Sequence, residues 1–139
     1  MKTSENGYQL IRDEEGFTPV AKGDYGHQEI GYGHDLLPGE SFPDGIDETQ
    51  GEFLLQHDVA KAEDALNRLI PPTCTQNQFD ALIDFTYECG PEAIEQLLNH
   101  GWSQVTVQLP RWVHAGGQVL QGMVTRRQKE IELFNEVGA

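Results

Sequence analysis

Apolar residues recur at helical spacing over most of the chain. The clearest stripe steps by four, three, four and three residues, which keeps its members on one face of a helix. It consists of Leu55, Val59, Ala62, Leu66 and Leu69. The stripe predicts a long helix over about 47–70, because Asp47 is suited to cap the first turn and Pro71-Pro72 cannot continue the last one.

Shorter helices are predicted on both sides of this long helix. Glycine or proline marks most of their ends, as is usual for helix termini. The predicted ranges are 4–15, 76–89, 91–100, 103–114 with a break at Pro110, and 121–136. Gly116-Gly117 opens a turn before the last of these.

Residues 17–34 have a different character. Four glycines divide this stretch into short pieces such as Glu29-Ile30-Gly31-Tyr32, which predicts a compact β-hairpin or small sheet. Residues 35–46 are expected to form a loop. The fold class is therefore α+β and mainly helical, with a β-containing lobe at about 14–46 and a long connecting helix, all in one domain spanning 1–139.

The charge and composition of the chain limit the classes of partner that we expect it to bind. The formal net charge of −14 disfavours binding to nucleic acid and to anionic lipid. The chain has no apolar run of the roughly 20 residues that a membrane span needs, and its first sixteen residues lack the apolar centre of a secretory signal. We therefore expect a monomer made in the host cytoplasm, with no membrane span and no cofactor.

The two cysteines are expected to stay unpaired. Cys74 precedes a predicted helix and Cys89 ends it, so about 22 Å of helix separates them. A disulfide needs Cα atoms within about 7 Å. Two cysteines without neighbouring ligands also make a structural zinc site unexpected, and no metal site is predicted.

Three acids close together in the sequence point to glycosidic bond cleavage. This reaction commonly uses two carboxyl groups, one of them protonated. Glu15 ends its helix on the same face as Tyr8 and Ile11, so burial and the helix dipole should both raise its pKa. Asp24, in a glycine-flanked turn, should be better solvated and ionised, and Glu29 follows nearby. In a chain with 23 acidic residues, such proximity also arises by chance.

Longer motifs resemble those of phage-type lysozymes (endolysins). Glu15-Gly16-Phe17, Asp24 and Ile30-Gly31-Tyr32-Gly33-His34 are similar to the family's catalytic glutamate, its aspartate nine positions on and its IGYGH-like strand. The similarity continues, in the family's order, through Gln76–Leu82, Pro110-Arg111-Trp112, Gly116–Gly122 and Arg126-Arg127. The resemblance covers nearly the whole chain.

The resemblance implies a two-lobed lysozyme-like fold with a cleft between the lobes. It implies peptidoglycan as substrate, cut between N-acetylmuramic acid and N-acetylglucosamine, and release from the host cytoplasm to reach the cell wall. Glu15 maps to the general acid, Asp24 to its acidic partner and Arg126 to an arginine beside the catalytic glutamate. His34 is expected to form structural hydrogen bonds, and Tyr87 to be a core or cleft-wall aromatic.

Two positions depart from the family pattern. Glu29 stands where the family usually has threonine, so it either activates water, attacks the sugar directly or adjusts its neighbours by repulsion. Glu88 stands where the family usually carries an amide, and it either faces the cleft or lies on the surface.

These departures and the acidic charge keep two other functions open. The first is a lysozyme-fold protein that binds a glycan or a partner through an altered site. The second is a glycosidase or transglycosidase acting on a neutral or chitosan-like polysaccharide, because a strongly acidic protein is repelled by anionic polymers at low salt.

Overall fold

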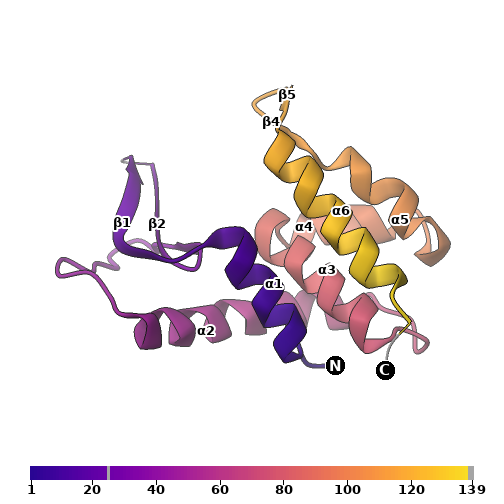
Figure 1. The fold of residues 1–139 in the computed structure, drawn as a ribbon, viewed down its shortest axis with the longest axis horizontal. Coiled ribbons are helices and arrows are strands. Elements are labelled where there is room, and N and C mark those ends of the chain that lie inside the picture. Colours follow the sequence, from indigo (N-terminus) through magenta and orange to yellow (C-terminus); the bar gives the residue numbers. More distant parts are fainter. Residues whose placement is uncertain (25, 138–139) are drawn as a thin grey trace.

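The chain folds into a small antiparallel sheet at one end and a group of helices at the other, with one long helix running between them (Figure 1). The structure, a computed structural model, describes residues 1–24 and 26–137, and all of their side chains except that of Asp24. In chain order the elements are α1 Glu5–Glu15, β1 Thr18–Asp24, β2 His27–Gly31, β3 His34–Asp35, α2 Glu48–Asn67, α3 Gln76–Cys89, α4 Pro91–Leu98, η1 Trp102–Gln104, α5 Val105–Gln108, η2 Leu109–Arg111, β4 His114–Ala115, β5 Gln118–Val119 and α6 Gln121–Asn135.

Local capping explains why the two central helices begin where they do. The Asp47 side chain accepts a hydrogen bond from the backbone N–H of Gln50 at 2.8 Å, and the Gln50 side chain accepts one from the Asp47 N–H at 2.9 Å. Thr75 and Gln78 form the same reciprocal pair at the start of α3. Each pair satisfies two backbone donors that the first helical turn leaves free.

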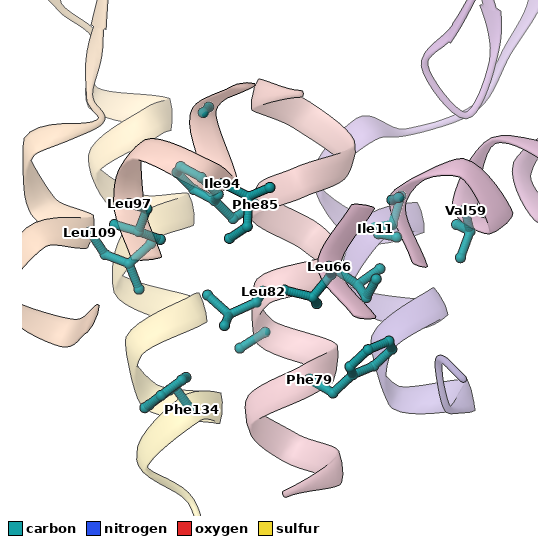
Figure 2. Packing of buried hydrophobic residues seen from close by; sticks show 14 of the residues in the cluster. Ile11, Val59, Leu66, Phe79, Leu82, Phe85, Ile94, Leu97, Leu109 and Phe134 are labelled. Atoms are coloured by element: carbon teal, nitrogen blue, oxygen red, sulfur yellow. The ribbon is translucent and has the colours of Figure 1, made fainter. Parts of the chain in front are cut away.

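Helix α3 lies at the centre of the hydrophobic core. Phe79, Leu82 and Phe85 are fully buried on it, and α3 contacts α1, α2, α4 and α6. Figure 2 shows side chains from the surrounding elements converging on these residues, among them Ile11, Leu66, Ile94, Leu97, Leu109 and Phe134. Burial of side chains of this size stabilises by about 1.5–3 kcal/mol each, so α3 is held firmly and its polar residues have fixed positions.

The sheet has the strand order β1-β2-β3, with antiparallel neighbours. Glu29 pairs with Lys22 of β1 and with Asp35 of β3. Gly31 and Gly33 adopt φ values of +66° and +77°, a region that favours glycine. The small sheet, the long α2 and the helical group confirm the mainly helical α+β class that the sequence predicts.

Three local predictions need correction. Helix α2 ends at Asn67 rather than near residue 70, because Leu69 and Ile70 both donate to the carbonyl of Leu66 in a tightened last turn before Pro71. Helix α4 ends at Leu98 rather than 100. The predicted helix at 103–114 is three short pieces, η1, α5 and η2, since Pro110 has no N–H to continue an α-helical ladder.

The glycine turn at 116–117 joins a two-stranded hairpin, β4 and β5, which the sequence analysis did not predict. Cys74 and Cys89 are both free, and burial raises the pKa of each thiol to about 11. Within 1–24 and 26–137, none of the helices combines the length and the apolar character needed to cross a membrane.

Candidate active site

Glu15 ends α1 at the point where the sheet meets the helices. Its side chain is 17% exposed, and Gly16 follows in a positive-φ conformation that turns the chain towards β1. Gly33 packs directly against it, because a Cβ at Gly33 would lie 2.8 Å from the Glu15 carboxyl carbon. Glycine at this position is therefore required both by its backbone angle and by the close approach of the acid.

Arg126 of α6 holds the Glu15 carboxyl. Its Nη1 donates to Glu15 Oε2 at 2.8 Å, and its Nε and Nη2 donate to the two oxygens of Asp84 at 2.8 and 2.9 Å. Arg126 is 7% exposed and the Asp84 side chain is not exposed at all. The guanidinium is thus fixed by a two-bond pair with Asp84, and its remaining edge faces Glu15.

Opposing influences set the pKa of Glu15. Burial raises the pKa of Glu15, the charge and hydrogen bond of Arg126 lower it, and the nearby charges of Asp84 and Glu29 raise it. The result is a pKa above the ordinary glutamate value of 4.5. The sequence analysis expected burial to act in this direction, and the family resemblance placed Arg126 beside Glu15.

The other two predicted acids lie on the sheet. Glu29 is 47% exposed on β2, with its Oε1 at 3.3 Å from Nε2 of His27. It is close enough to Glu15 for its charge to act on that carboxyl. Asp24 ends β1, where its backbone pairs with His27, but its side chain lies outside the described residues.

Glu88 is not a free surface residue, because it pairs with the arginines of α6. Its Oε1 accepts a short hydrogen bond from Nη2 of Arg127 and lies 3.7 Å from Nε of Arg126. Arg127 also donates to both oxygens of Glu130, at 2.6 and 3.0 Å. Glu88 therefore belongs to the charged group between α3 and α6.

A cavity of about 350 Å³ lies between the sheet end and the helices, and neither Glu15 nor Glu29 is among the residues that line it. Gly33, which covers the Glu15 carboxyl, lines it together with Tyr87, whose hydroxyl donates to the carbonyl of Tyr32. Burial raises the pKa of the Tyr87 hydroxyl strongly, so it stays protonated. The remaining lining residues are His34, Asp35, Leu37, Asp58, Lys61, Ala62, Ala65, Thr86, Gly90 and Pro91.

His34 has a structural setting at the edge of this cavity. Its Nδ1 lies 2.6 Å from Asp58 Oδ2 and its Nε2 lies 2.7 Å from Glu40 Oε1. Burial alone would lower the pKa of His34, but the two carboxylates raise it above 6.5. Through these two contacts the ring joins the loop at 36–46 to α2.

One group of described side chains is able to hold a metal ion. His27, Glu29 and Asp35 place one ligand atom each within 4.8 Å of one another, and all three are exposed. His27 Nε2 lies 3.3 Å from Glu29 and 3.4 Å from Asp35. An imidazole placed between two carboxylates accounts for the same geometry without an ion. The sequence analysis had not grouped these residues.

The sequence analysis also missed Asp84 and Glu130. Asp84 interrupts the apolar run Ala81-Leu82-Ile83 and Phe85 on α3. A carboxylate in such a run is a signal, because buried acids need a charged or hydrogen-bonded partner. Its partner could not be read from the spacing, since Arg126 lies 42 residues further along the chain.

Comparison with known proteins identifies the family that the chain matches. Residues 12–130 match the Phage lysozyme family. The endolysin of Bacillus phage PZA is 36% identical over 151 aligned residues, which cover 97% of this chain and 55% of that protein. The chain spans 54–61% of the length of four curated endolysins that match at 33–36% identity.

Solved structures share the fold along the whole chain. The muramidase domain of SpmX from Asticaccaulis excentricus matches with a TM-score of 0.85 at 29% identity, covering 98% of this chain and 99% of that domain. A mutant of P22 lysozyme matches with a TM-score of 0.78 at 26% identity, with coverage of 98% and 99%.

Proposed function

Because the chain belongs to the phage lysozyme family, we propose that it is an endo-acting glycoside hydrolase that cleaves peptidoglycan between N-acetylmuramic acid and N-acetylglucosamine. The observation that carries this proposal is the setting of Glu15. A mostly buried carboxyl with a raised pKa, oriented by a single arginine bond, is suited to give a proton to a leaving oxygen at neutral pH.

Glu29 and Asp24 provide the second carboxylate. The more exposed Glu29 stands on β2 and its charge acts on Glu15, as two carboxyls flanking one glycosidic bond require. In this proposal Glu29 is the base that activates water or the nucleophile that attacks the sugar, and Asp24 is the acidic partner nearby. Tyr87 and Gly33 form the wall against which the sugar lies.

The cavity lined by Gly33, which packs against Glu15, is the proposed position of the glycan. Its volume of about 350 Å³ lies within the range of small-ligand sites. Lys61 is the one lysine or arginine among its lining residues, and in the described part of the chain its amino group has no hydrogen bond or ion pair. It is therefore available to a carboxylate of the wall polymer.

The first experiment measures reducing ends released from purified peptidoglycan. Glu15→Gln keeps the shape of the side chain but cannot donate a proton, so kcat/KM should fall by about 10³-fold. Asp13→Asn is the matched control, because Asp13 is exposed on the same helix and bonds only to Gln9. If wild type releases no reducing ends but still binds the polymer, the protein is a glycan-binding member of the family and the hydrolase proposal is wrong.

The second experiment assigns Glu29. Glu29→Gln should lower kcat/KM by about 10²-fold if its carboxylate is the base or nucleophile. The anomer first released, observed by proton NMR, separates the two roles. Retention indicates a covalent nucleophile and inversion indicates a base acting on water. An unchanged rate in Glu29→Gln would indicate that Asp24, and not Glu29, is the base or nucleophile.

The net charge of −14 favours a second candidate substrate, a neutral or cationic polysaccharide such as a glucosamine polymer. Assays on both polymers at low and moderate salt distinguish the two. Peptidoglycan cleaved fastest at low salt would exclude repulsion as a limit and support the first candidate.

A further inference from the structure

A group of charged side chains lies behind Glu15, between α3 and α6, and the proposed reaction does not use most of it. Its members are Asp84 and Glu88 of α3 and Arg126, Arg127 and Glu130 of α6. Asp84 and Glu130 have no exposed side-chain surface, and Arg127 is 1% exposed. Three carboxyls thus share a nearly dry space with two guanidiniums.

Asp84 and Glu130 interact with each other, and each also forms two hydrogen bonds with an arginine. Two carboxyls in contact away from water favour a proton on one of them, because two like charges raise the pKa. Burial and the neighbouring Asp84 raise the pKa of Glu130 well above its usual range, against the effect of Arg127. Burial alone would raise the pKa of Asp84, but the hydrogen bond with Glu130 and the two arginines lower it. Of the two carboxyls, Glu130 therefore has the higher pKa and takes up a proton first.

The pairing of these side chains determines the charge that faces Glu15. Asp84 holds Arg126 through two hydrogen bonds, and Glu88 adds a weaker contact to Arg126 at 3.7 Å. Arg127 pairs with Glu88 and Glu130. Glu15 then faces a guanidinium that another carboxylate already neutralises. An uncompensated arginine at 2.8 Å would instead stabilise the ionised form of Glu15.

We propose that Asp84 is a positioning residue that acts on Glu15 through Arg126. This inference rests on the proposed function. The Asp84 carboxylate holds Arg126 through two hydrogen bonds and cancels its charge, so that Glu15 retains the proton that it gives to the leaving oxygen. Asp84 itself does not touch the substrate, since it is fully buried behind Arg126.

The other charged groups around these carboxyls do not replace Asp84. Glu29 faces Glu15 from the exposed side, on β2, and Tyr87 stays protonated. Lys129 is paired with Glu14 at 2.7 Å. Cys89 is a protonated thiol that accepts from Arg127 at 3.3 Å. Among the described residues, Asp84 alone forms a two-bond pair with Arg126.

The test follows the Glu15 carboxyl itself by carbon-13 NMR as the pH is varied, in wild type, Asp84→Asn, Glu130→Gln and the double variant. Asp84→Asn should lower the titration midpoint of Glu15 by about one pH unit or more. Glu130→Gln should leave it unchanged, because glutamine is neutral like the protonated acid. The double variant, in which neither position can ionise, should shift at least as far as Asp84→Asn.

Control measurements distinguish a specific effect of Asp84 on Glu15 from a general effect of net charge. Glu132→Gln removes one exposed acid from the same helix and should leave the midpoint unchanged. The high-pH limb of kcat/KM should move with the Glu15 midpoint in each variant. If no glycan is cleaved, the proposed function fails while the NMR titration still decides the role of Asp84.

Three results would overturn the proposal. They are an unchanged Glu15 midpoint in folded Asp84→Asn, a shift in Glu130→Gln as large as that in Asp84→Asn, and an Asp84 carboxyl that is protonated in wild type at pH 7. The last is read from wild-type protein alone, so it decides the question even if Asp84→Asn does not fold.

Discussion

Two buried basic side chains, Arg126 beside Glu15 and His34 beside the loop at 36–46, each lie between two carboxylates. Arg126 lies between Asp84 and Glu15 at 2.8 to 2.9 Å. His34 lies between Asp58 and Glu40 at 2.6 and 2.7 Å. Both cations are nearly inaccessible, with 7% and 4% of their side chains exposed.

The two groups differ in which partner can change its charge. A guanidinium keeps its proton at any accessible pH, so in the first group the pH-dependent change falls on a carboxyl, and the pKa of Glu15 is raised. An imidazole titrates near neutrality, so in the second group the histidine changes, and the pKa of His34 is raised. The same arrangement thus produces a proton-donating carboxyl at Glu15 and a pH-dependent ion pair at His34.

The largest expected effect comes from removing the permanent cation. Arg126→Gln leaves the fully buried Asp84 without its two-bond partner, and the free energy of unfolding should fall by about 3 kcal/mol. Arg126→Lys keeps the charge but cannot form two parallel bonds, so its loss should be roughly half as large. Urea unfolding at neutral pH measures both.

Arg111→Gln is the control for this pair, because Arg111 is exposed and has no hydrogen bond or ion pair in the described part of the chain. It should change the unfolding free energy by less than about 0.5 kcal/mol. Equal losses in Arg126→Gln and Arg126→Lys would show that the two-bond geometry contributes nothing.

The second expected effect depends on pH. Because the folded pKa of His34 is raised, its contribution is fully present below the unfolded value of about 6.5 and is lost as pH rises through the folded pKa. Burial raises the pKa of Glu40, but the hydrogen bonds with the Leu37 N–H and with His34 lower it below 4.5. The contribution of Glu40 to stability is therefore present above about pH 4.5 and is lost as the pH falls through the folded pKa. His34→Gln should therefore lower stability by about 2 kcal/mol near pH 5.5 and by clearly less near pH 9.

His57→Gln provides the comparison on α2, since His57 is exposed and unpaired among the described residues. Its effect should be within about 0.5 kcal/mol at both pH values. A loss in His34→Gln that is the same at pH 5.5 and pH 9 would mean that the ring acts as a neutral packing group.

The contrast between these groups also shows what the sequence can predict. Caps, glycines and apolar stripes act within a few residues, and they placed α1, α3 and α6 to within a residue or so. The resemblance added Arg126 beside Glu15. The buried partners of both cations could not be predicted in this way, because Asp84 and Asp58 lie 42 and 24 residues from the cations that they hold. The prediction also failed for η1–η2, where packing and Pro110 override a weak helical stripe.

Lys61 differs from both of these groups. It is a cation that lines the cavity, and no carboxylate of the described residues is bonded to it. If the proposed substrate is anionic, Lys61→Gln should raise KM for peptidoglycan by about threefold with kcat unchanged, as expected for one exposed ion pair. The increase should vanish at high salt. Arg68→Gln, which removes an exposed cation just beyond the end of the same helix, should leave KM unchanged. An equal rise in KM in both variants would mean that only the net charge matters, and no rise in either would mean that the polymer's anionic groups lie elsewhere than in this cavity.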